Sequence, residues 1–391
     1  MCEVNELGEF KKKKLCIFSA NYLPNVGGVE VYTECLARKL VERGIEVTVV
    51  TNNIFNLPDL VDDGSGLRLF RLPCYPLVDA RYPIPRLNRR FRDLWTSLES
   101  DRFDGVLVNT RFYIHSFMGL LIAKHSGVKP ALIDHGSGYL SFGKPVLDPI
   151  VAAYEQVVTR LQKTVFSVDY YGVSSESLKW LSSFGIQGKG VLGGAIDAEE
   201  FRRCSSGRSF RSELGISEDS LVVVYAGRLI GEKGIDFILE ALRDPWVACH
   251  DVVFLVAGAG PLRSEIERVE GRNLRFLGAL DRPDVSALLQ ESDVFCGLSK
   301  SEGFGYSMLE AAICGAFLIV TDVGIASDLC PDDSFGCVVD RPSAAKLIEV
   351  LQKCSDDRSW MKRLAGKCST RAEGLFSWDN AADAVVRACL R

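Results

Sequence analysis

Two glutamates within a glycine-rich segment are the residues of this chain best suited to bind a polar ligand. Glu302 and Glu310 stand eight positions apart in the run Glu302-Gly-Phe-Gly-Tyr-Ser-Met-Leu-Glu310. The pattern after Gly305 predicts a helix, so Glu302 lies on the preceding loop and Glu310 about one turn inside the helix. One carboxylate can then accept hydrogen bonds from sugar hydroxyls and the other from a ribose.

The loop between these glutamates suits phosphate oxygens. The first N–H groups of a helix have no partner within the helix and carry a partial positive charge. We therefore expect a phosphate to contact the backbone N–H groups of Gly303, Phe304, Gly305, Tyr306 and Ser307.

A basic pair follows another predicted strand. Arg228 and Lys233 lie in Ala226-Gly-Arg-Leu-Ile-Gly-Glu-Lys-Gly234, a strand-to-helix turn. A guanidinium holds phosphate with two parallel hydrogen bonds, and an ammonium acts on it as a point charge. As a charge pair alone this would be ordinary surface charge, but at a strand end it indicates a clamp for a diphosphate.

Further glycine turns follow other strands. Gly27 and Gly28 open onto a helix, where backbone N–H groups can approach an anion, and the alternative is a flexible turn. The segment does not match G-x-G-x-x-G, which argues against a nicotinamide site. Gly258-Ala-Gly260-Pro261 and Gly278 indicate either ligand contacts or turn chemistry, and both interpretations stay open.

These motifs depend on strands that alternate with helices in both halves of the chain. In the first half we expect a helix over 29–43 and strands over 14–19, 46–51, 105–109 and 131–134. In the second half we expect strands over 221–226, 252–257, 274–277, 294–296 and 317–320, with helices over 236–242, 262–269, 285–290 and 307–313. Apolar strands separated by amphipathic helices predict an α/β fold with parallel sheets.

Two doubly wound domains are expected, because 391 residues exceed the size of one hydrophobic core. The glycine-rich stretch 188–195 is interpreted as the hinge between residues 1–190 and 191–375. Two such domains facing each other leave a cleft lined by the carboxyl ends of their strands, where ligands of open α/β sheets bind.

The composition narrows the class of protein. The thirteen cysteines are scattered without a C-x-x-C pair, and only four histidines could complete metal sites, so reduced thiols are expected and structural zinc is not. No run approaches the roughly 20 apolar residues of a membrane span, and the first residues lack the pattern of a signal peptide. A cytoplasmic protein is expected.

The first half is the more basic. Residues 1–190 contain 23 basic and 20 acidic residues, against 23 and 31 over 191–391. Part of the basic excess is interleaved with apolar residues such as Tyr82, Leu87, Phe91 and Trp95, and consists of Arg81, Arg86, Arg89, Arg90 and Arg92. This patch indicates either a solvated helix face or a surface for anionic lipid or a phosphate-bearing acceptor.

Together the motifs resemble the retaining GT-B glycosyltransferases of the group 4 type, also called the glycosyl transferases group 1 family. The resemblance runs from the 24–28 loop through the Arg228 and Gly258 turns and the Glu-x7-Glu motif to Gly315 and Phe376-Ser-Trp378. It implies two Rossmann-like domains, with residues 376–391 forming a helix that crosses back to the first domain.

The resemblance also implies roles for residues. Arg228 and Lys233 resemble the pair that holds the donor diphosphate, Glu302 the residue that touches the donor sugar, and Glu310 the ribose ligand. Gly28 resembles the glycine that closes over the phosphates. Tyr306-Ser307-Met308 departs from the commoner small aliphatic run, which puts the identity of the sugar in doubt.

His135 is the expected catalytic residue of the first half, together with Glu302 from the second. It precedes Gly-Ser-Gly138 at a strand end and matches a histidine that faces the reaction centre in relatives; the alternative is a structural histidine. The end of another strand supplies candidates for an acceptor pocket, namely Asn109, Arg111, Tyr113 and His115.

The expected function is retaining transfer of a sugar from a UDP- or GDP-sugar to a hydroxyl of a glycan or lipid-linked acceptor, in cell-surface polysaccharide or glycoconjugate biosynthesis. The D-x-D metal signature is absent from the sequence, so metal-independent activity without a cofactor is expected, with phosphate charge met by Arg228, Lys233 and helix ends. Peripheral contact with the inner face of a membrane is open, and no nucleic-acid partner is expected. The alternatives are a nucleotide-sugar epimerase of related fold and a non-catalytic partner of a transferase.

Overall fold

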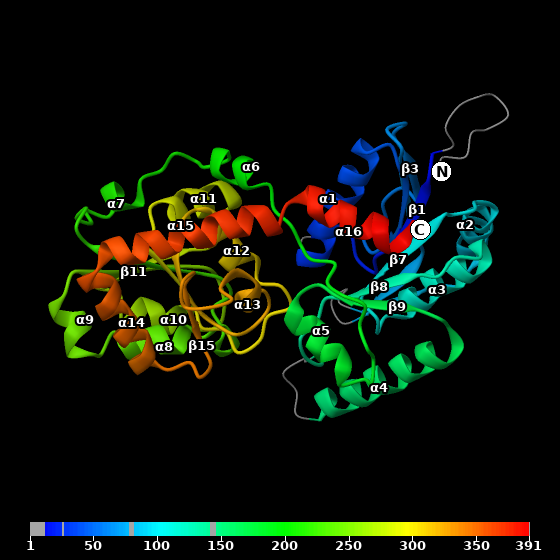
Figure 1. The fold of residues 1–391 in the computed structure, drawn as a ribbon. Coiled ribbons are helices and arrows are strands. Elements are labelled where there is room, and N and C mark those ends of the chain that lie inside the picture. Colours follow the sequence, from blue (N-terminus) through cyan, green and yellow to red (C-terminus); the bar gives the residue numbers. More distant parts are fainter. Residues whose placement is uncertain (1–11, 26, 78–81, 141–145, 391) are drawn as a thin grey trace. The chain divides into compact units, whose positions relative to one another are not determined.

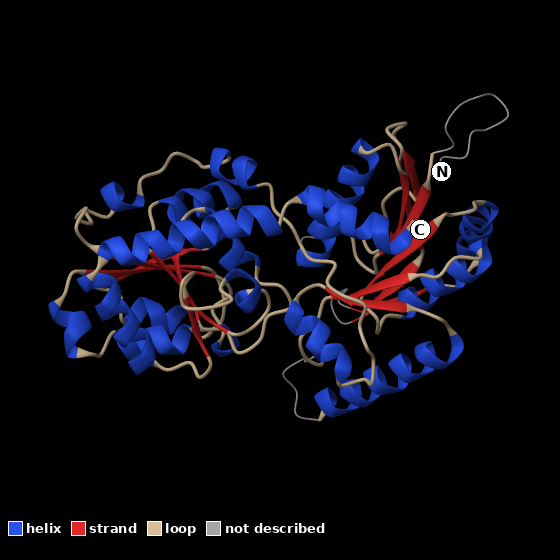
Figure 2. Cartoon of the chain, viewed as in Figure 1, coloured by secondary structure: helices blue, strands red, loops and turns tan. Residues whose placement is uncertain are grey.

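The computed structural model describes residues 12–25, 27–77, 82–140 and 146–390 (Figure 1). The chain divides into two compact units: unit 1 is Met1–Ala195 with Trp378–Arg391, and unit 2 is Ile196–Ser377. In each unit a mainly parallel sheet has helices on both faces (Figure 2). This confirms the predicted fold class of two Rossmann-like doubly wound halves.

Unit 1 contains a seven-stranded sheet in the order β3-β4-β2-β1-β7-β8-β9. Its strands are β1 (Lys14–Phe18), β2 (Glu46–Asn52), β3 (Leu60–Asp62), β4 (Leu67–Leu72), β7 (Gly105–Asn109), β8 (Ala131–Asp134) and β9 (Asp169–Gly172). Only β3 runs antiparallel to its neighbour in this sheet. The covering helices are α1 (Gly28–Glu42), α2 (Arg89–Ser100), α3 (Ile114–Ser126), α4 (Leu147–Val165) and α5 (Ser175–Ser182).

A separate two-stranded antiparallel sheet of unit 1 joins β5 (Cys74–Leu77) to β6 (Tyr82–Pro85). It precedes α2, and Tyr82 at the start of β6 is one of the apolar residues interleaved with the predicted basic patch. Arg81 of that patch lies outside the described residues, and Arg90 forms an ion pair with Asp59. Phe91 and Leu98 of α2 are buried, so much of its apolar side already serves the core of unit 1.

The last helix, α16 (Trp378–Cys389), packs on α1 in unit 1. Arg43 at the end of α1 contacts Asp379 at 2.9 Å and Asp383 at 2.5 Å. At the other end of α16 a Cβ added to Gly105 would lie 2.4 Å from the backbone oxygen of Cys389. Glycine at the start of β7 therefore permits the close approach of the helix end.

Unit 2 contains a six-stranded parallel sheet in the order β12-β11-β10-β13-β14-β15. Its strands are β10 (Leu221–Ala226), β11 (Val252–Ala257), β12 (Leu274–Gly278), β13 (Val294–Gly297), β14 (Phe317–Thr321) and β15 (Cys337–Val339). Its helical elements are α6 (Ala198–Arg203), α7 (Phe210–Glu213), η1 (Gly231–Lys233), α8 (Ile235–Ala241), α9 (Pro245–Cys249), α10 (Arg263–Arg268), α11 (Arg282–Gln290), α12 (Tyr306–Ile313), α13 (Ala326–Leu329), α14 (Ala344–Asp356) and α15 (Arg358–Leu375).

The strand order of unit 2 has a consequence for ligand binding. Successive strands lie on one side of β10 up to β12 and on its other side from β13 onward. The order therefore reverses between β10 and β13, and ligands of open α/β sheets bind at the carboxyl ends of strands beside such a point.

The stretch interpreted as a hinge is partly fixed to unit 1. The Lys189 N–H donates to the Tyr170 oxygen at 2.7 Å, and the Leu192 N–H donates to the Gly172 oxygen at 2.9 Å. Because these bonds extend the edge of the sheet at β9, the stretch is held to unit 1 as far as Leu192. The division between the units follows at Ala195 and Ile196.

Within the described part of the chain, none of the helices combines the length and apolar character that crossing a membrane requires.

Candidate functional site

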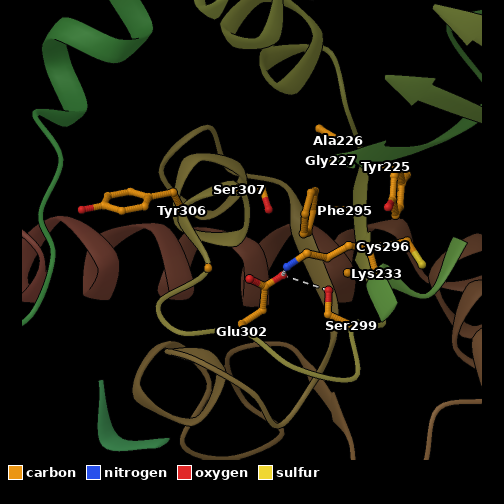
Figure 3. Close-up of a pocket in the computed structure, with 12 residues that line it drawn as sticks. Tyr225, Ala226, Gly227, Lys233, Phe295, Cys296, Ser299, Glu302, Tyr306 and Ser307 are labelled. Carbon is orange, nitrogen blue, oxygen red and sulfur yellow. Dashed lines mark hydrogen bonds and ion pairs between the residues drawn. The ribbon is translucent and has the colours of Figure 1, made fainter. Parts of the chain in front are cut away.

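A pocket of about 180 Å³ lies in unit 2 where the strand order reverses (Figure 3). The ends of β10 and β13, the residue that ends η1, the glutamate loop and the start of α12 all contribute to its walls. The lining residues are Tyr225, Ala226, Gly227, Lys233, Phe295, Cys296, Gly297, Ser299, Glu302, Gly305, Tyr306 and Ser307. The fold thus brings together the separate basic and acidic motifs identified in the sequence.

Lys233 and Glu302 are partners of each other in this pocket. The Lys233 Nζ lies 2.5 Å from the Glu302 Oε1, with the two side chains 19% and 15% exposed. The Ser299 hydroxyl donates to the same Oε1 at 2.9 Å (Figure 3). Sequence reasoning missed Ser299, although its position just after β13 could have indicated it.

The position of Lys233 depends on a glycine. Gly234 ends η1 with φ +75°, in the left-handed region that favours glycine. A Cβ at Gly234 would lie 2.1 Å from the backbone oxygen of Leu298. The turn can therefore pass directly against the segment that carries Ser299 and Glu302.

The Gly258 turn shapes the neighbouring loop. A Cβ at Gly258 would lie 1.8 Å from the Gly227 oxygen, and one at Gly260 would lie 2.5 Å from the Leu229 oxygen. Both glycines thus allow the end of β11 to pack against the loop after β10. Of the two open interpretations, the structure supports turn chemistry for this segment.

The start of α12 opens on the pocket through Gly305, Tyr306 and Ser307. Gly305 is the N-cap residue, with φ +96°, and has no side chain with which to cap the helix. The side chain of Phe304 is buried, and its ring packs against Tyr306 and Phe376. In Figure 3 the Tyr306 ring points away from Lys233 and Glu302.

The remaining predicted donor residues of unit 2 lie outside the pocket lining. Gly303 and Phe304 are not among the lining residues, and neither is Arg228, whose backbone oxygen accepts from the Tyr225 hydroxyl at 2.7 Å. Glu310 also lies outside the lining, and burial raises the pKa of its carboxyl to about 7, although Arg282 acts in the opposite direction. Their donor contacts stay predictions.

Gly27 and Gly28 begin α1 of unit 1 beside a carboxylate. Gly27 is the N-cap residue, and a Cβ there would lie 2.5 Å from the Glu30 Oε2. Glu30 is buried and accepts from the Asn25 side chain at 2.8 Å. This helix end is already compensated by a negative charge, and a phosphate contact for the two glycines stays a prediction.

Arg111 was expected in an acceptor pocket, but the structure buries it in the core of unit 1. Its guanidinium donates to Asp134 at 2.8 Å, to Glu155 at 2.9 Å and to Thr159 at 2.9 Å. Burial raises the pKa of both carboxyls, and Arg111 opposes that rise. Arg111 is 1% exposed and holds these elements together, so its position does not support the expected acceptor contact.

His115 is likewise a core residue. Its Nε2 lies 2.9 Å from the Val50 oxygen, and its ring packs against Phe18. Burial lowers its pKa to about 4, so the imidazole is neutral at physiological pH. The acceptor role expected for His115 is therefore not supported by its position. Tyr113 is half-buried and stacks on Tyr82.

Asn109 is buried but controls the state of His135. The Thr33 hydroxyl donates to the Val29 oxygen at 2.7 Å, so it accepts from the Asn109 Nδ2 at 2.9 Å. The Asn109 Oδ1 then faces the His135 Nε2 at 3.0 Å, which requires a proton on that nitrogen. Burial lowers the pKa of His135 to about 3. His135 is thus neutral, with Nδ1 as its acceptor nitrogen.

The described residues contain no group of three or more His, Cys, Asp or Glu side chains arranged to hold a metal ion. The metal independence expected from the sequence stays a prediction.

Gly234→Ala tests the close approach that positions Lys233. We expect a loss of about 3 kcal/mol or more in the free energy of unfolding, because the new Cβ meets the Leu298 oxygen. Gly207→Ala is the control, since Gly207 has φ +74° but no atom within 4 Å of its added Cβ. It should cost about 1–2 kcal/mol from backbone strain alone. Urea unfolding checks both, and equal losses would contradict the packing argument.

Glu310→Gln tests the burial of that carboxyl. The folded chain retains a proton on Glu310 from its ordinary pKa of 4.5 up to about 7. Folding stability contributed by this proton is therefore lost as pH rises through that window. We expect the melting temperature of the variant to equal that of wild type at about pH 4 and to be about 2–4 °C higher at about pH 8. Calorimetry without ligand checks this, with the exposed Glu349→Gln as control; a gap independent of pH would count against it.

Asn109→Asp tests the control of His135. A carboxylate beside the ring favours the imidazolium, so the pKa of His135 should rise from about 3 toward its ordinary 6.5. NMR titration of the side-chain nitrogens follows this change and reports the Nε2–H tautomer in the wild type. His115 serves as the internal control. An unchanged His135 titration would refute the inference that Asn109 determines the protonation state of His135.

Comparisons with known proteins identify the family to which both units belong. Residues 26–187 match the family model described as Glycosyltransferase Family 4, and residues 207–373 match the one described as Glycosyl transferases group 1. The first match lies in unit 1 and the second in unit 2. Together they cover most of the chain.

Relatives and solved structures cover most of the chain as well. An uncharacterised glycosyltransferase of Methanocaldococcus jannaschii is 22% identical over 94% of this chain and 96% of its own length. One subunit of the human phosphatidylinositol N-acetylglucosaminyltransferase is 26% identical over 87% of this chain and 68% of its own. The structure of HepE from Anabaena in complex with UDP has a TM-score of 0.71 at 16% identity, covering 96% of this chain and 98% of HepE. The chain therefore belongs to the glycosyltransferases that the two family models describe, with the GT-B fold.

Proposed function

We propose that the chain is a retaining glycosyltransferase that moves a sugar from a UDP- or GDP-sugar to a hydroxyl of a glycan or lipid-linked acceptor. The pathway would be cell-surface polysaccharide or glycoconjugate biosynthesis. One observation carries the proposal: Lys233, Glu302 and the start of α12 line one pocket beside the reversal of strand order in unit 2.

The Lys233–Glu302 pair supports an exchange of partners on donor binding. A diphosphate carries more negative charge than one carboxylate and competes for the Lys233 ammonium. Glu302 is then released to accept hydrogen bonds from hydroxyls of the donor sugar, while Ser299 still holds its Oε1. The same two residues thus serve both the phosphate end and the sugar end of the donor.

In the proposed reaction the bond between the anomeric carbon and the phosphate oxygen breaks, and a bond to the acceptor oxygen forms on the same face. The acceptor proton passes to the leaving phosphate, so no protein nucleophile is required. Lys233, Arg228 and the first N–H groups of α12 stabilise the charge that develops on the diphosphate. These groups make a metal ion unnecessary in the proposal, and no cofactor is invoked.

The proposal assigns the acceptor to unit 1. HepE, a neighbour in fold, was solved with UDP, and the human relative is named for phosphatidylinositol. These names support a uridine donor and a lipid-linked acceptor, which we extend to this chain as part of the proposal. His135 is proposed to hydrogen-bond a reacting hydroxyl as a neutral imidazole. A cytoplasmic chain with peripheral membrane contact fits such an acceptor.

Lys233→Ala tests the donor site. We expect affinity for UDP or GDP and their sugars to fall by about 10–100-fold, because a charge-assisted contact is lost. Calorimetry measures binding, and release of the nucleoside diphosphate measures turnover, with EDTA present to test metal independence. Lys346→Ala is the control, because this partly exposed lysine pairs with the neighbouring Glu349 and is not among the residues that line the pocket.

The double variant Lys233→Gln/Glu302→Gln separates a loss of donor binding from a loss of folding, because it leaves no unpaired charge in the pocket. Full donor binding and turnover in Lys233→Ala would refute the site. Conversion of the donor sugar without acceptor would indicate an epimerase, and binding without turnover a non-catalytic partner. NMR of the product decides whether the anomeric configuration is retained.

A further inference from the structure

Helix α4 of unit 1 has its apolar side exposed and a largely polar side buried. Its buried residues are Glu155, Val158, Thr159 and Gln162. The exposed side carries apolar residues at helical spacing, which we name the α4 stripe: Leu147, Ile150, Val157, Leu161 and Val165. Val157 is 66% exposed and Ile150 is 61% exposed. A surface helix of a globular protein normally has the opposite orientation.

Contacts with the buried Arg111 hold α4 in this orientation. Glu155 and Thr159 accept hydrogen bonds from its guanidinium, and the Gln162 Nε2 donates to its backbone oxygen at 2.6 Å. Turning α4 over would leave a buried guanidinium without these partners, which costs several kcal/mol. The α4 stripe therefore belongs to the surface of unit 1.

The α4 stripe is connected to a second apolar feature. Tyr154 of α4 and Tyr82 of β6 contact each other, and both hydroxyls donate to the Phe112 oxygen. Phe117 of α3 meets Phe166 directly after α4. In Figure 1 α2, α3 and α4 lie along one flank of unit 1.

The second feature is a groove of about 800 Å³ between β6, α2 and α3. We name it the α2–α3 groove; its apolar lining includes Ile84, Leu87, Phe91, Trp95, Ile114 and Leu121. Leu87 is 76% exposed. The volume falls in the range of small-molecule sites, and an apolar lining of this kind suits a hydrocarbon chain.

The charges beside these apolar surfaces are mainly basic. Lys124 lines the α2–α3 groove, Arg86 precedes Leu87, and the exposed Arg160 borders the α4 stripe. Glu99 is the acidic residue of the groove lining, and it accepts from the Trp95 Nε1 at 2.7 Å. Basic side chains next to an aliphatic helix face complement anionic lipid headgroups.

We propose that this flank of unit 1 binds the surface of an anionic phospholipid bilayer, with the α4 stripe at the headgroup boundary and an acyl chain in the α2–α3 groove. The nineteen residues of α4 extend over about 28 Å, enough to lie along the bilayer plane. The stripe is aliphatic, whereas protein interfaces are anchored by buried Trp, Tyr and Arg. A bilayer is therefore favoured over a protein partner. The inference rests on the proposed function for its purpose, since it brings the enzyme to a lipid-linked acceptor.

Flotation of the full chain with vesicles tests the inference. One set of vesicles is phosphatidylcholine, and the other is phosphatidylcholine mixed with phosphatidylglycerol. We expect stronger flotation with the anionic set, decreasing with added salt. Val157→Ser/Leu161→Ser should lower the vesicle-bound to free ratio by about tenfold or more. The control Val269→Ser/Leu375→Ser changes two half-exposed apolar residues of unit 2 and should float like wild type.

Thermal unfolding verifies that the α4 variant stays folded, which is expected because both side chains are exposed. Wild type that floats with neither vesicle set, or an α4 variant that floats as well as wild type, would overturn the inference. A wild-type dimer in sedimentation velocity that the α4 variant converts to monomer would instead assign the flank to a second copy, and would also overturn it.

The outcome is separable from the proposed function. The α4 variant should bind donor nucleotide like wild type, and Lys233→Ala should float like wild type. Lost flotation with intact donor binding and transfer in wild type would refute only the bilayer inference. Lost turnover with intact flotation would refute only the proposed function.

Discussion

Parallel strands place all their carboxyl ends at one edge of a sheet, and the candidate residues of both units depend on this constraint. In unit 2 the reversal of strand order beside β10 separates the turns that follow β10 and β13, which leaves space between them. Lys233 comes from the first turn and Glu302 from the second, so the sheet brings them to 2.5 Å. Gly234 contributes by allowing the first turn to pass against the backbone of the second segment.

Each unit contains a shielded network of opposite charges, and accessibility decides what each can do. In unit 2 the Lys233 and Glu302 side chains are 19% and 15% exposed and line a pocket, so a ligand can exchange with either partner. In unit 1 the side chains of Arg111, Asp134 and Glu155 are each 1% exposed. Breaking that network would leave an uncompensated buried charge, which costs far more than it could return in binding. The first network suits function and the second suits architecture.

The sequence was most informative where the physical signal is local. The central strands β1, β7, β10 and β11 are continuous apolar runs, and their predicted bounds agree with the structure within a residue. Strands β4 and β9 were not predicted, because LRLFRL mixes charge with apolar residues and DYYG has no apolar run.

The candidate site was predicted from the rule that ligands bind at the carboxyl ends of parallel strands. Lys233, Glu302 and the start of α12 line one pocket, as this rule requires. In unit 1 the same rule failed to separate ligand-facing from inward-facing residues. Arg111 lies two residues and His115 six residues after the end of β7, while His135 directly follows β8. Arg111 and His115 are both core residues. Sequence position gives the edge of the sheet, but the direction of a side chain depends on partners that are distant in the chain, here Asp134, Glu155 and Val50.

Helix α4 shows the same dependence at the scale of a whole element. Its amphipathic pattern defines an apolar side and a polar side but does not determine which side is buried. A surface helix normally buries its apolar side, because burial removes hydrocarbon from water. Here the buried Arg111 is bonded by Glu155, Thr159 and Gln162 of α4. Turning the helix over would remove these partners and leave Asp134 alone to compensate the buried guanidinium, which costs several kcal/mol. The orientation of the exposed stripe thus follows from a charge on β7's exit loop, so the surface of unit 1 is determined by its core.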